Sequence, residues 1–144
     1  MDNEPYYIVK ASQLFKLLKH CFCCGNKAEV DNTRTIGTLL IVTLICDSCT
    51  KNPKWFSQPY VGKSKIPEGN LLLSSGILFS GASPSKVMQV LDIARIESIS
   101  EQTYFKYQRD CLNPIIWHHY KNEQQAIIEK AKKNETGLIL GGDA

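Results

Sequence analysis

Four of the six cysteines stand in two Cys-x-x-Cys pairs, Cys21 with Cys24 and Cys46 with Cys49, and 21 residues separate the pairs. Two residues between cysteines allow a tight turn to direct both sulfurs at one point, and Gly25 suits such a turn because glycine accepts a positive φ. A zinc ion takes four soft ligands at the corners of a tetrahedron, about 2.3 Å from the metal. The two pairs therefore predict a structural zinc site with these four cysteines as ligands.

Other uses of the cysteines stay open from the sequence. The spacing lies just outside the window of about 15–20 residues typical of four-cysteine zinc sites. Disulfides, a thioredoxin-like redox pair, an iron–sulfur cluster and uninvolved thiols are the alternatives, although disulfides are rare in reducing compartments and a redox pair normally stands alone before a helix. Cys23 could replace a neighbouring cysteine and His20 adjoins the first pair, but only Cys21 with Cys24 mirrors the second pair.

The segment between the two pairs predicts the return path that such a site needs. Residues 35–45 are rich in Ile, Val, Leu and Thr, which is typical of a strand. A hairpin through Glu29 and this strand would bring the pairs together, as in a zinc ribbon. Residues 6–9 predict a further short strand, and residues 50–69 predict a loop. We expect residues 1–69 to form a zinc-ribbon-like module with an N-terminal strand, then a helix capped by Ser12, and a basic aromatic loop.

Residues 70–112 carry the start and stop signals of three short helices. A helix-turn-helix-like unit, whose last helix enters the DNA major groove, and an ordinary three-helix bundle both fit this pattern. In the third helix, Tyr104, Phe105, Cys111 and Leu112 are expected to face inward. The signals are Asn70 as a cap, Gly81 as a stop, Ser83-Pro84 as a second start, and either Ser98 or Ser100 as the third cap.

Asn113 and Pro114 predict the start of a longer helix by the same logic. One face of this helix carries Ile116, Tyr120, Ile127 and Ala131, and a short apolar strand follows at residues 138–140. Residues 113–144 therefore form the third expected region.

The positive excess is partly concentrated in residues 35–70, which hold four basic and two acidic residues, although the net charge of +3 is too small to imply a polyanion partner by itself. Lysines interleaved with aromatic residues suit phosphate and base contacts. A solvated linker with Trp55 packed on the ribbon is the alternative for residues 50–69. The candidate DNA contacts are Lys51, Lys54, Lys63 and Lys65 in the loop and Lys106 and Arg109 on the third helix.

Composition limits the class of protein further. The 144 residues are 43% hydrophobic and 22% charged, as in an ordinary folded domain or two small ones. No apolar stretch approaches the roughly 20 residues of a membrane-spanning helix, and the acidic start lacks the apolar core of a signal peptide. We expect a soluble, intracellular chain with no membrane contact.

The order of several motifs resembles the central part of Kolobok-type DNA transposases and transposase-derived proteins, from about Cys21 to the last residue. Besides the cysteine pairs, the motifs are Trp55, Ser57-Gln58-Pro59, Gly69-Asn70-Leu71-Leu72-Leu73, Ile77-Leu78-Phe79-Ser80-Gly81, Gln108, Leu112-Asn113-Pro114 and Leu140-Gly141-Gly142-Asp143. The resemblance implies a zinc module, a helical region, and a C-terminal strand that begins an RNase H-like domain. By matching position, Asp143 would be the first acid of a catalytic triad that holds Mg²⁺ in a complete transposase.

Two departures from the family limit this inference. Glycine and then arginine usually follow the aspartate, whereas Ala144 follows here, and the remaining acids are absent. Nucleases of this kind hold two metal ions with several carboxylates, so one aspartate does not suffice.

The sequence thus predicts an α+β chain in which a four-cysteine zinc-ribbon-like module precedes a helical region and the first strand of an RNase H-like sheet. The expected function is that of a nuclear DNA-binding fragment of a transposase-like protein, catalytically incomplete as given. Transposon ends are the expected partner, and self-association is a further candidate. Two alternatives are a zinc-dependent protein-interaction module without DNA binding, which the eight acids and eight bases of residues 71–144 favour, and the front part of an active nuclease.

Overall fold

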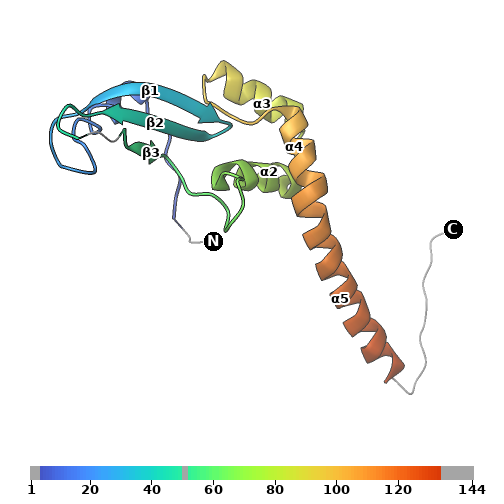
Figure 1. Ribbon diagram of the computed structural model, residues 1–144. Helices are drawn as coiled ribbons and strands as arrows, with labels where there is room; N and C mark the ends of the chain where they lie inside the picture. The colour runs from blue at the N-terminus through green and yellow to red at the C-terminus, as the bar shows by residue number, and fades with distance from the viewer. Residues whose placement is uncertain (1–3, 50–51, 134–144) are drawn as a thin grey trace.

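The computed structural model describes residues 4–49 and 52–133, and its fold is α+β (Figure 1). A short helix leads into a three-stranded antiparallel sheet, and a group of helices follows the sheet. No helix in these described ranges is long and apolar enough to cross a bilayer. In chain order the elements are α1 (Ala11–Leu14), β1 (Glu29–Ile36), β2 (Leu39–Ile45), β3 (Lys54–Phe56), α2 (Glu68–Ser80), α3 (Pro84–Ile93), α4 (Glu101–Tyr107), the π-helical turn η1 (Gln108–Leu112) and α5 (Asn113–Lys132).

The sheet has the order β1-β2-β3, so β2 is its central strand. Val42 and Leu44 of β2 are completely buried, and they pack with Leu18, Ala28 and the cysteines on one face of the sheet. Side chains alternate between the two faces of a strand, so one face of β2 covers this core, while the other is exposed or half-buried except at Leu39, which is completely buried. The N-terminal hydrophobic core is therefore continuous with the cysteine cluster.

The β1–β2 hairpin confirms the expected return path but corrects its bounds. Gly37 and Thr38 form a two-residue connection, and Gly37 has a φ of +61° at the position where a type II′ turn favours glycine. Residues 35–45 are therefore two strands and a turn, not one strand. The expected loop at residues 50–69 also contains β3, which pairs with β2.

The predicted strand at residues 6–9 is wrong. This segment forms no regular structure, and Tyr7 and Ile8 are 80% and 82% exposed. A strand exists only where a partner receives its backbone hydrogen bonds, and neither sheet edge pairs with these residues. Residue preference alone does not supply that partner.

A second, smaller core joins the first three helices of the C-terminal half. Ile77 of α2, Ile99 just before α4, and Tyr104 of α4 are buried together, with Val87 and Met88 of α3 half-buried against them. Ser100, not Ser98, caps α4, since its side chain accepts a hydrogen bond from the Thr103 N–H at 3.2 Å. Phe105 was expected to face inward but is 51% exposed.

The backbone is helical without interruption from α4 through η1 to α5, so Asn113 does not restart a helix. The wide π turn lies immediately before Pro114, whose ring has no N–H to donate and would clash with the carbonyl of a regular preceding turn. The result is one long helix, whose α5 part projects away from the rest of the molecule (Figure 1).

A hydrogen-bonded network connects the sheet to the helices. Asn70 was expected to cap α2, but the helix begins at Glu68 and the Asn70 side chain instead reaches the hairpin turn. Its Oδ1 accepts from the Thr38 N–H at 2.7 Å and from the Thr38 hydroxyl at 2.8 Å, and its Nδ2 donates to the Ile36 carbonyl at 3.0 Å. Gln58 completes the network by donating to Thr38 Oγ1 and accepting from the Gly69 N–H.

Candidate metal centre and basic sheet face

The first cysteine pair lies in a tight turn between α1 and β1. The Cys21 N–H donates to the Asn26 carbonyl at 2.8 Å, and the Gly25 N–H donates to the Cys21 carbonyl at 2.9 Å. Gly25 has a φ of +73°, as the sequence predicts for a residue that closes this turn. The turn brings Cys21 and Cys24 to the same side of the backbone.

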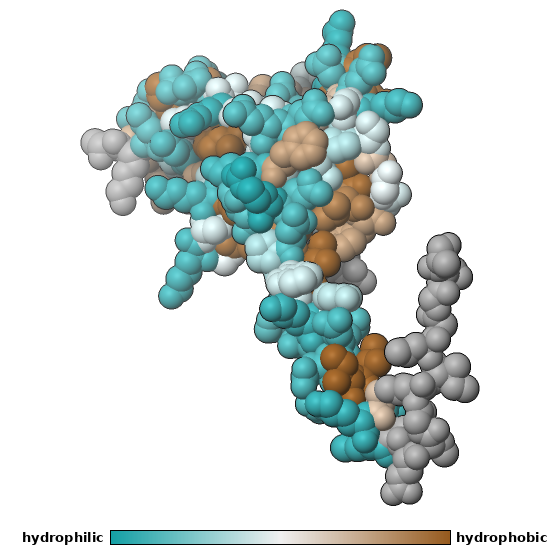
Figure 2. Space-filling model, turned by 90° about the vertical axis from the view of Figure 1, so that its right-hand side faces the viewer, coloured by the Kyte–Doolittle hydropathy of each residue, from teal (hydrophilic) through white to brown (hydrophobic). Residues whose placement is uncertain are grey.

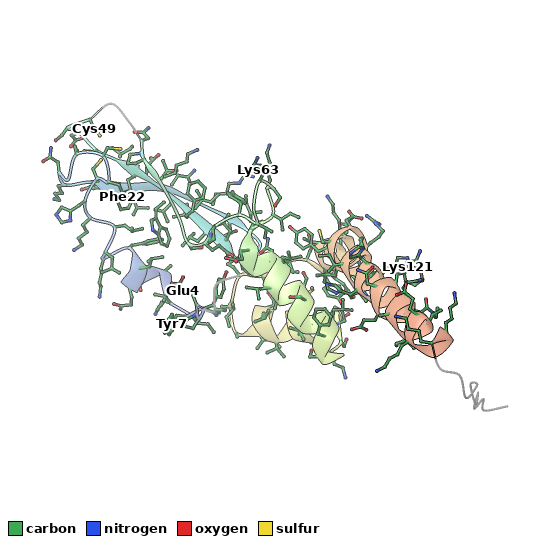
Figure 3. The ribbon with its side chains drawn as sticks, turned by 90° about the horizontal axis from the view of Figure 1, so that it is seen from below. Glu4, Tyr7, Phe22, Cys49, Lys63 and Lys121 are labelled. Carbon is green, nitrogen blue, oxygen red and sulfur yellow. The ribbon has the colours of Figure 1, made fainter. Side chains whose placement is uncertain are left out.

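The second pair follows directly from the central strand. Cys46 comes after the last residue of β2, and a turn then places the Cys49 N–H 3.4 Å from the Cys46 carbonyl. Because β1 and β2 are antiparallel, the end of β2 lies beside the start of β1, where the first turn ends. Figure 3 shows Cys49 and Phe22, which belong to the two turns, at the same end of the molecule.

The four sulfurs of the two pairs converge. Cys21 Sγ lies 3.5 Å from Cys49 Sγ, Cys24 Sγ lies 3.5 Å from Cys46 Sγ, and all four atoms lie within 4.8 Å of one another. These separations exceed the roughly 2.05 Å of a disulfide bond. Four sulfurs about 2.3 Å from a central ion would stand about 3.8 Å apart, so the cluster can hold one metal ion in tetrahedral coordination.

The surroundings of the cluster favour the thiolate form at one cysteine. The pKa of Cys21 is lowered from 9.0 to about 6, chiefly because the Cys23 N–H donates to its sulfur at 3.4 Å. Burial opposes this effect. The pKa of Cys24 is raised: the Asn26 N–H lowers it, but the Cys46 side chain, burial and the Cys21 side chain together outweigh that effect. One thiolate thus forms readily, and a bound cation would favour the thiolate form of the others.

The remaining candidate ligands lie outside the cluster. Cys23 is exposed and is not among the four converging cysteines, although its backbone N–H supports Cys21. His20 is exposed and pairs through its backbone with Lys27 on the other arm of the first turn. Cys111 lies in η1, in the helical half of the molecule.

The predicted DNA contacts occupy separate parts of the surface. Lys54 is exposed on β3, while Lys63 and Lys65 are exposed in the turn between β3 and α2. Lys106 lines a polar groove between α4 and the hairpin turn. Arg109 forms an ion pair with the neighbouring Asp110, with 2.7 Å between Nε and Oδ1, so its charge is locally balanced.

Lys51 and Asp143 lie outside the described residues, as does the strand expected at residues 138–140.

The outward face of the sheet carries a group of residues that the sequence analysis did not assemble. The strand register places Arg34 opposite Ile41 and Ile41 opposite Phe56, and it places Lys54 opposite Thr43 on the same face. Phe56 is 43% exposed, and its ring packs edge-on against that of Tyr60 at 6.2 Å between centroids. We call Arg34, Lys54, Phe56 and Tyr60 the basic sheet face. Trp55 points to the opposite face and packs on the N-terminal core, as the linker alternative expected.

Only the strand register reveals this face. Arg34 is separated from Lys54 by an entire hairpin, and no local pattern in the sequence marks it as a neighbour of Phe56. If residues 54–56 are recognised as a strand, the alternation of side chains places Lys54 and Phe56 on one face of the sheet and Trp55 on the other.

The chain matches no protein-family model, and neither the curated proteins nor the solved structures contain a match to it.

Proposed function

We propose that this chain is a zinc-stabilised DNA-binding module of a transposase-like protein. The metal proposal rests on four convergent sulfurs, because an all-thiolate tetrahedral set favours zinc over the oxygen-seeking cations. The metal would fasten the two turns at one end of the hairpin and thereby stabilise the sheet as a zinc-ribbon-like module. Its role is structural, since all four coordination positions are filled by protein.

The basic sheet face is the observation that carries the DNA-binding proposal. Lys54 and Arg34 are exposed cations that flank a solvent-accessible aromatic pair, Phe56 and Tyr60. Cations neutralise phosphates and exposed rings stack on bases or pack against sugars. The turn with Lys63 and Lys65 follows Tyr60 along the chain, and Figure 3 shows Lys63 directed away from the body of the molecule. These few cations would therefore contact the backbone of a nucleic acid locally, although the chain as a whole is only weakly positive.

Salt-dependent binding of labelled duplex DNA tests this proposal. Fluorescence anisotropy with the zinc-loaded chain at increasing salt should give a log–log slope of about −3 to −5, because each neutralised phosphate contributes about −0.9. The triple variant K54Q/K63Q/K65Q should weaken binding by 10-fold or more and make the slope less negative by about 2–3. Incubation of the same duplexes with Mg²⁺ should leave them uncut, since the chain carries only one of the acids that its resemblance implies.

A matched triple variant controls for the loss of net charge. Lys10, Lys16 and Lys86 are exposed lysines away from the basic sheet face, and K10Q/K16Q/K86Q removes the same three charges. Equal weakening by both variants would contradict the assignment of the face. Absence of any salt-dependent binding by the zinc-loaded parent would contradict DNA binding altogether.

The resemblance to Kolobok-type transposases supports the same proposal from the sequence. It implies transposon ends as the DNA partner, a nuclear location and a nuclease that this chain alone does not complete. Ser57-Gln58-Pro59 and Gly69-Asn70, two of the motifs that carry the resemblance, contribute Gln58, Gly69 and Asn70 to the network between sheet and helices. In this chain these motif residues thus stabilise the fold and do not take part in catalysis.

A protein-interaction module is the second candidate function. Phe79 at the end of α2 and Val90 and Ile93 of α3 are 71%, 64% and 75% exposed. Val90 and Ile93 lie three residues apart on one face of α3, and large apolar side chains that share an exposed face favour contact with another protein. This candidate predicts zinc-dependent folding without DNA binding, so the anisotropy experiment separates the two.

A further inference from the structure

The projecting helix α5 has no packing partner within the described residues. None of its residues is buried, and Trp117, Ile127 and Tyr120 are 58%, 67% and 51% exposed. Figure 2 shows this helix as a narrow extension below the body of the molecule, with a patch of apolar side chains on it. Helices in proteins obtain most of their stability from packing of an apolar face, so a helix of this length exposes a face that a partner would cover.

Most of the apolar side chains of α5 form a single stripe. At about 100° per residue, one arc of roughly 120° holds them together with Asn113 and Gln124 and contains no charged residue. The six apolar members of this stripe are Ile116, Trp117, Tyr120, Ile127, Ile128 and Ala131.

Contacts within the helix hold several of these side chains in place. The rings of Trp117 and Tyr120 stack at 5.6 Å between centroids, and the Lys121 ammonium lies 5.2 Å from the Trp117 ring. The Gln124 amide donates to the Tyr120 hydroxyl at 3.3 Å. The stripe is thus partly ordered before any partner binds, which lowers the entropy lost on association.

The charges beside the stripe select the kind of partner. Glu123 and Lys130 border one edge and Lys121 borders the other. When two such helices pack antiparallel, each edge meets the same edge of its partner, whereas a parallel pair joins opposite edges. An antiparallel register that pairs Tyr120 with Ala131 and Gln124 with Ile127 also pairs Glu123 with Lys130, twice by symmetry.

We infer that α5 is a self-association surface, on which a second copy of this chain binds antiparallel through the apolar stripe. The interface is isologous, as in most two-fold dimers, since the same surface serves both copies. The self-complementary pairing of Glu123 with Lys130 favours a second copy over an unrelated helix. The two bodies of the dimer then lie at opposite ends of the helix pair.

Sedimentation equilibrium of the zinc-loaded full chain, over concentrations from micromolar to about 1 mM, tests this inference. The parent should approach twice the monomer mass with increasing concentration. Ile127→Asp should raise the dissociation constant about 100-fold or more, because symmetry introduces two buried charges. A parent that stays monomeric over the whole range would overturn the inference.

Two further variants test the surface and the orientation. Ile115 is 57% exposed on the opposite side of α5, so Ile115→Asp is a matched control that should leave the dissociation constant within about 2-fold. Glu123→Lys should weaken association, and adding Lys130→Glu should restore it. Equal effects of the two Ile→Asp variants would contradict the stripe, and failure of the double charge swap would contradict the antiparallel register. Unchanged circular dichroism of each variant verifies that it folds.

Discussion

The two ends of the β1–β2 hairpin are held by different chemistry. At its open end, four cysteine sulfurs converge within 4.8 Å, and Cys46 is continuous with the buried strand. At its turn, the side chains of Asn70 and Gln58 hold Thr38 by hydrogen bonds of 2.7–2.9 Å. One end therefore offers a site for a metal ion, and the other depends only on groups of the chain.

This difference separates what each end can contribute to stability. Thiolates that surround a metal gain a large binding free energy, all of which is lost when the metal leaves. Hydrogen bonds contribute about 1 kcal/mol each, but their loss costs more when a buried partner stays unsatisfied. Asn70 is 1% exposed, and within the described residues every buried side-chain nitrogen and oxygen has a partner. The turn end would thus contribute less to stability than a bound metal, but its contribution does not depend on the supply of metal.

Removal of the metal should produce the largest effect. Structural zinc contributes about 10–16 kcal/mol of apparent binding free energy, so chelation should unfold the sheet. The purified chain should carry one zinc per molecule by elemental analysis, and a strong chelator should abolish its cooperative thermal transition in circular dichroism. Cys46→Ser should have the same consequence without chelator.

Cys23→Ser is the matched control for the metal site. Cys23 is exposed and stands outside the four converging sulfurs, so this variant should retain one zinc and its thermal transition. Loss of zinc on Cys23→Ser, or a melting curve of the parent that does not respond to the chelator, would contradict the assigned ligands.

The turn end should respond to Asn70→Ala with a smaller loss. The substitution removes three hydrogen bonds and leaves the Thr38 N–H and the Ile36 carbonyl without their partner. We expect the free energy of unfolding to fall by about 3 kcal/mol, measured by urea denaturation of the zinc-loaded protein. Zinc content should stay at one per molecule, because the cysteines lie at the opposite end of the hairpin.

An asparagine on the exposed surface provides the comparison. Asn122 lies on α5 and bonds only to the neighbouring His118 among its described contacts, so Asn122→Ala should change the free energy of unfolding by less than about 0.5 kcal/mol. A similar loss for both variants would mean that the network contributes nothing beyond an ordinary surface contact.

The contrast between the ends also explains which parts of the molecule the sequence predicts. The convergence of the cysteines follows from a local pattern, two residues between ligands and a glycine after the first pair, together with an apolar hairpin between them. Helix punctuation is local too, and Gly81, Pro84 and Ser100 act at their predicted places. Such features need no knowledge of distant residues.

The network at the turn depends on distant residues, so no local pattern reveals it. The place of Asn70 near the start of a helix favours a capping role. Its side chain instead forms hydrogen bonds with Thr38 and Ile36, which lie 32 and 34 residues earlier in the chain. Gln58 in a loop segment favours exposure, yet it is 9% exposed because Thr38 and Gly69 approach it from two other elements. The basic sheet face was missed for the same reason, because Arg34 and Phe56 become neighbours only through the strand register.

Two glycines provide the finest comparison of the hairpin ends. Gly25 in the cysteine turn and Gly37 at the hairpin turn have similar φ values, +73° and +61°, so alanine is strained by its backbone at both. A Cβ on Gly25 would have nothing within 4 Å, whereas a Cβ on Gly37 would stand 2.5 Å from Asn70 Oδ1. The expected loss is about 1 kcal/mol for Gly25→Ala, from the left-handed backbone alone.

Gly37→Ala should cost about 1–2 kcal/mol more than Gly25→Ala, because the Asn70 side chain must move and its bonds to Thr38 weaken. Urea denaturation of both variants at saturating zinc measures this difference. In the Asn70→Ala background the extra cost of Gly37→Ala should disappear, since the clashing atoms are gone and only the backbone strain is left. An extra cost that persists without the Asn70 amide would show that the strain at Gly37 resides in the turn itself and that the network tolerates the added methyl group.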